Sequence, residues 1–303
     1  MSDAPGRPHR GTIFVEQGEI LAHQAHPGAQ YVLRVQAPRA ARTAQPGSFA
    51  HVRCDPALPM RRPLSLLRAD AEAGWLELLY KVVGAGTELL ARRQPGERLD
   101  LMAPIGTPFV PDPARPRALL LGGGVGLPPM IFLADRLRRR AGFRPVAFLG
   151  SEVPFPFPAR PSRILLPQVP YGVIACMPLL DDWGVPSRLA SLQGYPGCHH
   201  GYVTDLARHW LDALDPEQRA QVELFACGPE PMLAAAAALA RDYDLPGQLS
   251  LEEYMACAVG GCAGCAVEII TPAGPAMKRV CVDGPVFPAA SVAAFRAPAG
   301  ASA

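Results

Sequence analysis

The sequence has little of what nucleic-acid-binding, membrane or exported proteins need. Its 29 basic residues nearly balance 27 acidic ones, aromatic residues make up only 7% of the 303, and no basic stripe interleaved with aromatics occurs. These features argue against a nucleic-acid partner. No uninterrupted apolar run reaches the ~18 residues needed to span a bilayer, and the polar opening MSDAPGRPHRG lacks the apolar stretch of a signal peptide. We therefore expect a soluble cytoplasmic protein without a membrane or nucleic-acid partner, whose eight cysteines are thiols or metal ligands.

The first third of the chain reads as a series of short strands. Turn signals such as Pro46-Gly47 and Pro95-Gly96 separate runs rich in β-branched, aromatic and leucine residues. Strands of this length and spacing predict a small antiparallel β-barrel that ends near residue 111. One helix, 87–92, is expected to interrupt the barrel directly after two glycines. The predicted strands are 12–15, 31–35, 49–53, 64–67, 76–83 and 99–102.

A proline-rich linker, 111–116, precedes a change of rhythm to alternating strands and helices. That alternation predicts a doubly wound parallel α/β sheet over residues 112–248. Thr204 is expected to cap the N-terminus of the second helix. A third region, 249–303, holds a cysteine-rich segment. The predicted strands of the sheet are 118–121, 146–149, 173–176 and 222–226, and the predicted helices are 128–140, 204–214 and 229–240.

Half of the cysteines gather near the C-terminus with the spacing C-x4-C-x2-C-x15-C. Plant-type [2Fe-2S] proteins use C-x4-C-x2-C with a distant fourth cysteine. Gly260, Gly261 and Gly264 would let such a loop bend sharply and bring amide groups close to the sulfides. The spacing therefore predicts a [2Fe-2S] cluster. Structural zinc, which favours two C-x2-C pairs at finger spacing, and unligated thiols are the alternatives. The predicted ligands are Cys257, Cys262, Cys265 and Cys281.

Two segments of the predicted barrel carry residues suited to a flavin dinucleotide. In Arg61-Arg62-Pro63-Leu64-Ser65, an arginine beside extended backbone can clamp a diphosphate, and the serine can reach a ring nitrogen. In Tyr80-Lys81-Val82-Val83-Gly84-Ala85-Gly86-Thr87, two glycines let the backbone approach phosphate just before a helix begins. Each segment alone is also typical of a surface strand or a plain turn. Their combination at this separation favours a flavin site.

A nicotinamide dinucleotide site is expected at the edge of the predicted sheet. Four glycines follow strand 118–121 and open a helix, the position that a dinucleotide phosphate needs. Their spacing differs from the G-x-G-x-x-G fingerprint, so a plain strand–helix turn is the alternative. Cys227-Gly228-Pro229 likewise ends a strand and starts a helix, and a small buried hydrophobe is the alternative role of the cysteine. Glu152 could accept from a ribose hydroxyl, which would favour NAD, but an exposed loop carboxylate is the commoner role. The four glycines are Gly122, Gly123, Gly124 and Gly126.

The motif R-P-L-S followed by Y-K-V-V-G-x-G-T resembles the FAD-binding barrel of the ferredoxin–NAD(P) reductase superfamily. With the segments 122–129 and 227–232 and the C-terminal cysteine set, the chain resembles the electron-transfer subunits of NAD-dependent (class 1B) dihydroorotate dehydrogenases from about residue 11 to residue 288. The resemblance implies an FAD-binding barrel (1–111), an NAD-binding α/β domain (112–248) and a [2Fe-2S] domain (249–303). It also implies a hetero-oligomer with an FMN-containing catalytic subunit that oxidises dihydroorotate to orotate in pyrimidine biosynthesis.

The resemblance also implies roles for individual residues. Cys227 would lie beside the nicotinamide ring, with Gly228 and Pro229 following it, and the four C-terminal cysteines would bind the cluster. Residues of the two barrel motifs would bind FAD: Arg62, Pro63, Leu64 and Ser65 at the flavin and its diphosphate, Tyr80, Lys81 and Val82 along the ribityl chain and ring, and Gly86 and Thr87 at phosphate.

Three positions depart from the family pattern. Ala258 replaces the glycine usual after the first cluster cysteine, Gly261 stands where alanine is usual, and Ala85 replaces a lysine between the two phosphate-loop glycines. If residue 258 needs a positive φ, the alanine would strain the loop by roughly 1 kcal/mol. None of the three removes a ligand.

The leading hypothesis is therefore an oxidoreductase subunit that passes electrons between a partner flavoenzyme and NAD through a [2Fe-2S] cluster and FAD. Because the cofactors supply the chemistry, no acid–base residue of this chain is required. One alternative is a diaphorase-like NAD(P)H subunit of a hydrogenase, sulfite reductase or glutamate-synthase type of complex. Another is a non-redox scaffold protein that contains zinc.

Overall fold

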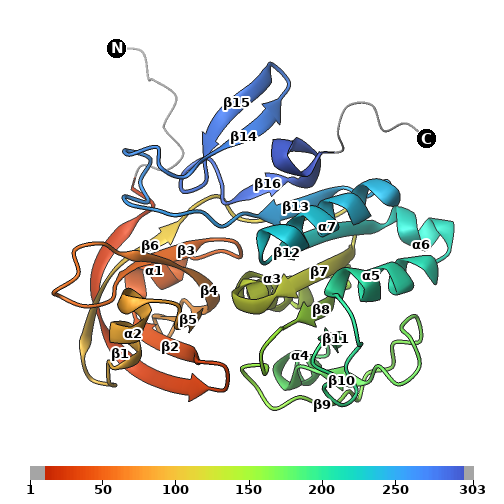
Figure 1. Ribbon diagram of the computed structural model, residues 1–303, viewed down its shortest axis with the longest axis horizontal. Helices are drawn as coiled ribbons and strands as arrows, with labels where there is room; N and C mark the ends of the chain where they lie inside the picture. Colours follow the sequence, from red (N-terminus) through yellow and green to blue (C-terminus); the bar gives the residue numbers. More distant parts are fainter. Residues whose placement is uncertain (1–10, 297–303) are drawn as a thin grey trace.

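The computed structural model describes residues 11–296, which form a β-barrel beside an α/β layer (Figure 1). The barrel takes the N-terminal colours of the figure, and the layer to its right takes the green and cyan ones. A loop and a hairpin from the last part of the chain extend over the junction between them. The predicted fold class, a barrel followed by a doubly wound α/β layer and a small C-terminal region, is confirmed.

The barrel closes from six antiparallel strands in the order β1-β2-β5-β4-β3-β6. Its interior is filled by aliphatic side chains that alternate along the strands, as the twofold side-chain period of a strand requires. Two short helices, α1 (Pro38–Thr43) and α2 (Ala85–Ala91), lie between strands. The strands are β1 (Phe14–His26), β2 (Gln30–Gln36), β3 (Phe49–Arg53), β4 (Arg62–Asp70), β5 (Trp75–Lys81) and β6 (Arg98–Ile105).

The first strand is much longer than the predicted 12–15. Its polar residues and Gly18 hide the strand pattern, because much of β1 is exposed. Gly18 is required where β1 crosses the neighbouring strand: a Cβ there would lie 2.4 Å from the carbonyl oxygen of Gln36. The helix α1 was also not predicted, since six residues are too few to show a helical period.

The α/β layer is built on a six-stranded sheet in the order β11-β8-β7-β12-β13-β16. All neighbours are parallel except the last pair. The helix α3 packs on one face of the sheet, against Leu120 and Ala147. The helices α5 and α7 pack on the other face, against Leu119 and Leu121. The strands are β7 (Arg117–Gly123), β8 (Val146–Gly150), β11 (Ser187–Ala190), β12 (Val222–Cys227), β13 (Gly247–Ser250) and β16 (Val286–Pro288), and the helices are α3 (Leu127–Arg138), α4 (Pro178–Asp182), α5 (Val203–Asp212), α6 (Pro216–Ala220) and α7 (Glu230–Asp242).

Two local predictions for this layer were wrong. The segment 173–176 does not join the sheet: only Ala175–Cys176 is a strand, β10, and it pairs with β9 (Arg160–Pro161). The edge position belongs to β11, which the sequence did not reveal. Thr204 lies inside α5 rather than at its cap, because the carboxylate of Asp205 accepts from the amide of Tyr202 (3.0 Å) and moves the helix start to Val203.

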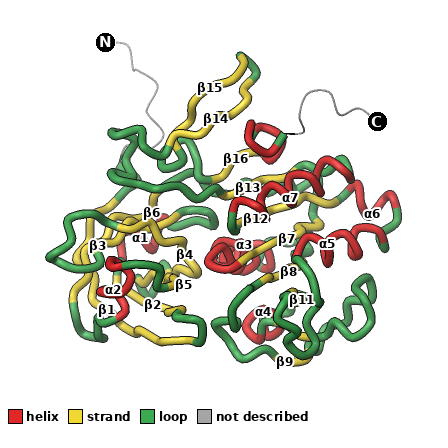
Figure 2. Tube along the Cα trace, viewed as in Figure 1, coloured by secondary structure: helices red, strands yellow, loops and turns green. Residues whose placement is uncertain are grey.

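The C-terminal region leaves the sheet and then returns to it. After β13 the chain runs as loop (Figure 2) through Cys257, Cys262 and Cys265 and forms a hairpin from β14 (Ala266–Thr271) and β15 (Gly274–Arg279), after which comes Cys281. It then pairs β16 with β13. The expected boundary at 248/249 falls within β13, and the division of the chain into three domains stays a prediction.

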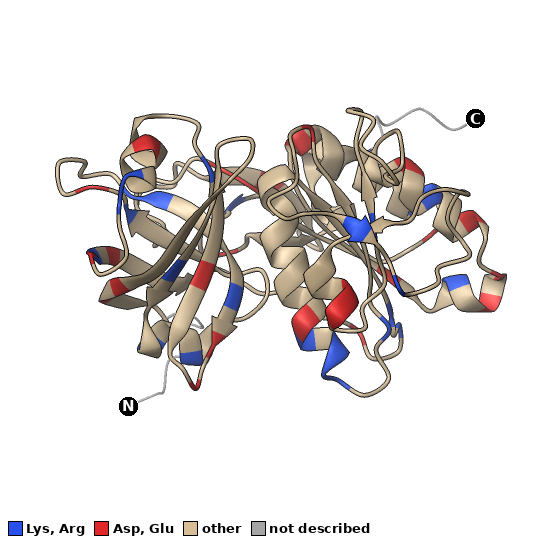
Figure 3. Ribbon diagram, turned by 90° about the horizontal axis from the view of Figure 1, so that it is seen from below, with Lys and Arg blue, Asp and Glu red and all other residues tan. Residues whose placement is uncertain are grey.

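Basic and acidic residues are intermixed along the chain, as the coloured ribbon of Figure 3 shows. Among residues 11–296, no helix is long and apolar enough to cross a membrane. A cytoplasmic location stays a prediction.

Candidate redox-cofactor site

The two flavin motifs lie on neighbouring strands at the side of the barrel that faces the α/β layer. Along β4, Leu64 and Leu66 pack into the barrel core, so Ser65 and Leu67 are directed to the other face. Leu67 belongs to the same apolar cluster as Leu127 at the start of α3. The strand that carries R-P-L-S is therefore packed against the helix that follows the glycine run of the sheet.

Arg62 and Gly86, one from each flavin motif, are brought into direct contact. A Cβ on Gly86 would lie 2.9 Å from Nε of Arg62, so a side chain there would displace the guanidinium from its present position. Arg62 donates to the carbonyl oxygens of Met60 (3.0 Å) and Arg61 (3.2 Å). Among the described residues it forms no ion pair, whereas neighbouring Arg61 is paired with Asp100. The positive charge of Arg62 is therefore available to an anion, as a diphosphate clamp needs.

Thr87 shapes the phosphate loop from within. Its hydroxyl accepts from the amides of Val83 (3.0 Å) and Gly84 (3.3 Å) and donates to the carbonyl of Gly84 (3.0 Å). The loop is thus fixed just before α2, whose first amides have no partners within the helix. Ala85, where a lysine is usual, is exposed at this helix start.

Tyr80 does not join the other predicted flavin residues through its side chain. Its ring is buried in the barrel, stacked on Tyr31 with 5.4 Å between ring centres. Its hydroxyl is hydrogen-bonded to Nε2 of His23 (2.8 Å). Burial raises the pKa of Tyr80, so the phenol stays protonated. Lys81 and Val82, the next two residues, are half-buried at the end of β5.

The glycine run after β7 meets the segment after β12. A Cβ on Gly126 would lie 2.3 Å from the carbonyl oxygen of Cys227, and Gly122 is the register partner of Cys227. Gly123 and Gly228 both lie against the thioether of Met232, where added Cβ atoms would come within 2.3 and 2.7 Å of the sulfur. The two motifs predicted from sequence therefore form one surface at the carboxyl edge of adjacent parallel strands.

The thiol of Cys227 is buried at this edge beside two residues that sequence reasoning missed. Burial raises the pKa of Cys227, the carboxylate of Glu252 raises it further, and Ser250 contributes an opposing hydrogen bond. Glu252 as a residue is exposed to solvent. Its carboxylate is nevertheless surrounded by protein atoms, and this desolvation raises its pKa. Ser250 ends β13, the strand beside β12, and Glu252 follows two residues later. Their position at the carboxyl end of a strand of the parallel sheet could have identified them as candidate site residues.

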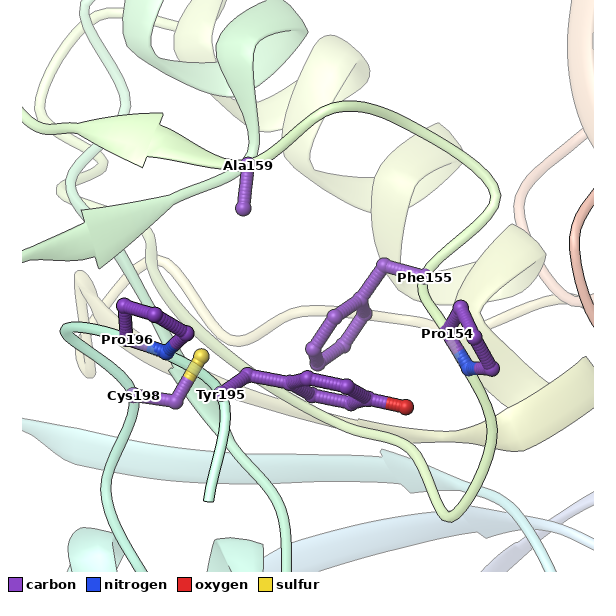
Figure 4. A pocket seen from close by; sticks show the side chains of 6 residues that line it. All are labelled: Pro154, Phe155, Ala159, Tyr195, Pro196 and Cys198. Carbon is purple, nitrogen blue, oxygen red and sulfur yellow. The ribbon is translucent and has the colours of Figure 1, made fainter. Parts of the chain in front are cut away.

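A cavity of about 300 Å³ lies between the loops that follow β8 and β11. Figure 4 shows the ring of Tyr195 beneath that of Phe155, with 6.2 Å between ring centres, and Pro154, Pro196 and Cys198 around them. Glu152, the candidate ribose acceptor, is exposed two residues before Pro154. The cavity lies beyond the same carboxyl edge of the sheet as Cys227.

The four clustered cysteines differ in exposure, and Cys257 is half-buried. Cys265 and Cys281 are buried, whereas Cys262 is exposed. Among residues 11–296, no three Cys, His, Asp or Glu side chains converge as a single metal ion would require. The C-x4-C-x2-C-x15-C spacing suits a plant-type two-iron cluster better than a structural zinc site.

Backbone amides of the cluster loop form hydrogen bonds to the sulfur of Cys257. Burial would raise the pKa of Cys257, but hydrogen bonds from amides of Val259, Cys262 and Gly261 outweigh it and lower the pKa to about 7. The Cys262 amide lies 3.4 Å from Sγ of Cys257. Burial and Cys265 raise the pKa of Cys281 to about 12. The loop thus offers N–H groups to sulfur, as the glycine-rich spacing predicted.

The cluster loop adopts left-handed backbone at two alanines. Ala258 has φ 55°, so the strain expected there from the sequence is present, and Ala263 has the same φ. Gly260 has φ 78°, whereas Gly261 is outside this region and its position does not require glycine. Arg279 holds the loop by donating to the carbonyl of Gly260 (3.0 Å).

Comparison with known proteins identifies the family of the chain. Residues 252–293 match the iron–sulfur cluster binding domain of dihydroorotate dehydrogenase B. Over 262 residues the chain is 34% identical to the "Dihydroorotate dehydrogenase B (NAD(+)), electron transfer subunit" of Desulforamulus reducens, an alignment that covers 85% of this chain and 90% of the relative. The chain belongs to this family of electron-transfer subunits. The family member of Bacillus caldolyticus is 37% identical over 254 residues, covering 82% of this chain and 86% of its own.

Solved structures agree with the fold. The NADH-dependent reduced ferredoxin–NADP oxidoreductase matches with a TM-score of 0.73 at 24% identity, covering 91% of this chain and 90% of its own. Phthalate dioxygenase reductase matches with a TM-score of 0.55 at 13% identity, covering 88% and 77%. The predicted family, reductase fold and function as an electron-transfer oxidoreductase subunit are confirmed. The family match agrees with the expected iron–sulfur cluster, and the names of the related electron-transfer subunits include NAD(+).

Ala263→Gly is expected to slow the loss of the cluster to an iron chelator about fivefold, because it removes roughly 1 kcal/mol of left-handed strain at an exposed position. Ala258→Gly should have a smaller effect, since the buried methyl group it removes contributes about 0.8 kcal/mol. The decay of iron–sulfur absorbance measures both rates. Ala256→Gly, at an exposed position without positive φ, is the control. Equal rates for Ala263→Gly and wild type would contradict the assigned strain.

Proposed function

We propose that the chain binds FAD, a [2Fe-2S] cluster and NAD, and that it passes electrons between NAD and a separate FMN-containing subunit that oxidises dihydroorotate. The spacing of the four cysteines carries this proposal, because it suits a two-iron cluster in a segment that matches an iron–sulfur cluster binding domain and follows a reductase-type barrel. Membership of the dihydroorotate dehydrogenase B electron-transfer family supports the substrate of the partner.

FAD would lie along β4 and β5 between the barrel and α3. The free guanidinium of Arg62, the adjacent backbone of Gly86 and the start of α2 suit its diphosphate. Ser65, directed out of the barrel, would contact the ring, together with Pro63 on the same face of the strand, whereas Leu64, whose side chain packs in the barrel core, would contribute its backbone. Tyr80 would contribute its backbone only, since its side chain is held inside the barrel by His23.

NAD would bind at the carboxyl edge of the sheet. The glycine run and the segment Cys227–Pro229 leave a surface without side chains where backbone can approach the dinucleotide. The cavity lined by Phe155 and Tyr195 would take its adenosine end, because an aromatic lining suits a flat base.

When bound, FAD exchanges a hydride with the nicotinamide and the cluster carries single electrons. The residues of this chain position these groups and exclude water. Cys227 does so as an uncharged thiol, because burial holds its pKa far above neutrality. Its small side chain fills the edge of the sheet between Ser250 and the glycine run.

The surface around the exposed Cys262 would dock the catalytic subunit. Tyr254 is 94% exposed, Val259 49% and Met277 65%, and all three lie on the cluster loop or the β14–β15 hairpin. Exposed apolar side chains next to a redox centre suit a protein interface, since a partner must come close to the cluster.

Cys262→Ser is expected to reduce iron and acid-labile sulfide to a small fraction of the wild-type content while leaving flavin content unchanged, because it removes one ligand outside the barrel. Chemical analysis of the anaerobically purified variant measures all three. Cys198→Ser, which alters a half-buried thiol outside the cluster set, is the matched control and should keep its iron. Full iron content in Cys262→Ser would refute the ligand assignment.

Arg62→Ala is expected to weaken FAD binding by about tenfold or more, since a charge-assisted hydrogen bond contributes roughly 1.5–3 kcal/mol. Flavin fluorescence during titration of the deflavinated protein measures the dissociation constant. Arg61→Ala is the control, because the charge of Arg61 is already paired with Asp100. Equal losses in the two variants would show that the clamp is not Arg62.

A further inference from the structure

The barrel makes one contact with the loop that forms the proposed adenosine site. The turn between β1 and β2 lies beside the loop that follows β8 (Figure 1). Along β2, Leu33 fills the barrel core, so Gln30 and Val32 lie on the outer face of the strand. Val32 packs against the apolar cluster that contains Phe155 of that loop. The second strand of the barrel therefore lies against the segment that lines the cavity.

The side-chain amide of Gln30 joins the turn to the loop. Its Nε2 donates to the carbonyl of Pro27 (2.9 Å) and to that of Pro154 (2.7 Å). Gln30 is only 1% exposed, so both hydrogen bonds lie in protein surroundings of low dielectric, where they are stronger than in water. The backbones also come close, since a Cβ on Gly28, which has φ 75°, would lie 3.0 Å from Cβ of Val153. The amide thus has one acceptor on each side of the junction.

The segment that Gln30 holds forms one wall of the cavity. Pro154 and Phe155 line the cavity from this loop (Figure 4). From the sheet side, the hydroxyl of Ser191, directly after β11, donates to the carbonyl of Ser151 (2.7 Å). The loop is therefore held at its start by the sheet and three residues later by the barrel. Without Gln30, side-chain hydrogen bonds would hold this wall at one end only.

The same turn also contacts the proposed flavin site. The amide of Val82 donates to the carbonyl of Ala29 (2.9 Å), and Lys81 is the register partner of Gln30. Both Lys81 and Val82 belong to the second flavin motif. The position of Pro154 is thereby set relative to the flavin segment. A dinucleotide that reaches from the flavin to the cavity has to match this distance.

We propose that Gln30 is a positioning residue for the nicotinamide dinucleotide, because its hydrogen bond to the Pro154 carbonyl holds the cavity wall against which the adenosine end binds. This inference rests on the proposed function, since it concerns the same NAD site. The nicotinamide ring would react at the other end of the dinucleotide, near Cys227. Gln30 should therefore affect how tightly the adenosine half is bound, and leave the hydride transfer from bound NADH unchanged.

The test compares NADH with reduced nicotinamide mononucleotide, which has the same reacting ring and lacks the adenosine half. Stopped-flow reduction of the flavin gives the dissociation constant and the limiting rate for each. In Gln30→Met, which keeps a similar volume without a donor, NADH should bind about fivefold more weakly, the effect of one hydrogen bond between uncharged groups. The dissociation constant of the mononucleotide and both limiting rates should stay unchanged, which a general loss of stability would not produce.

Gln36→Met is the matched control, because Gln36 lies on the same strand and its Nε2 donates to the Ala73 carbonyl (3.1 Å) within the barrel. It should bind NADH as the wild type does. An unchanged affinity of Gln30→Met for NADH, or equal losses for NADH and the mononucleotide, would overturn the positioning role. Should Gln30→Met fail to retain flavin, hydrogen exchange of residues 28–30 in the wild-type protein decides. Adenosine diphosphate ribose should slow this exchange, and equal exchange refutes the proposal.

Tyr195→Ala separates this inference from the proposed function, since Tyr195 lines the cavity from the loop after β11. Weaker binding of NADH by Tyr195→Ala, with wild-type binding by Gln30→Met, would refute the role of Gln30 and leave the adenosine site in place. Unchanged NADH binding in both variants would contradict the adenosine site itself. The two failures are therefore distinguishable.

Discussion

Residues 284–288 are the contact on which the arrangement of the three regions depends. The carbonyl of Gly284 accepts from the amide of Thr107 at the end of the barrel (2.6 Å), and that of Pro285 accepts from Leu251 at the start of the cluster segment (2.9 Å). The next three residues pair with β13 as the last strand of the sheet. Close approach is possible because Gly106 has no side chain: a Cβ there would lie 2.4 Å from Cδ of Pro285. One short strand thus ties the cluster loop to both the barrel and the sheet.

This junction explains how the loop sustains its own strain. Ala258 and Ala263 have left-handed backbone, which alanine disfavours, and the loop between β13 and β14 contains no regular secondary structure. It is held instead by the buried Cys265 and Cys281, by the amide of Val280 donating to the Cys265 carbonyl (2.9 Å), and by Arg279, whose side chain reaches Gly260. Because the loop is attached on one side only, Cys265 and Cys281 are buried, whereas Cys257 is half-buried and Cys262 is exposed. The side of the loop that carries Cys262 is therefore open to a partner.

The parts of the molecule that could be predicted from the sequence are those defined by short motifs of neighbouring residues. The cysteine spacing, the glycine run after β7 and the R-P-L-S strand could each be located because the residue types themselves limit the possible structures. The sequence did not reveal β11, whose four residues are buried in the sheet yet include Ser187 and Arg188. It could not show that Tyr80 points into the barrel, since that depends on the phase of β5 against β2.

Residues whose role depends on tertiary contacts were also beyond prediction. Ser250 and Glu252 reach Cys227 only because β13 lies beside β12. In contrast, the strain at Ala258 could be anticipated, because a departure from glycine identifies a backbone conformation without any knowledge of the fold.

Anaerobic titration of the purified chain with NADH tests the account most directly, because it counts the electrons that the assembled cofactors accept. If FAD and one cluster occupy the sites described, each chain should accept about three electrons, two at the flavin and one at the cluster, with bleaching of both absorbance bands. Uptake of about two electrons with an unchanged iron–sulfur band would contradict the cluster assignment. No uptake from NADH by protein that contains flavin would contradict the nicotinamide site at the edge of the sheet.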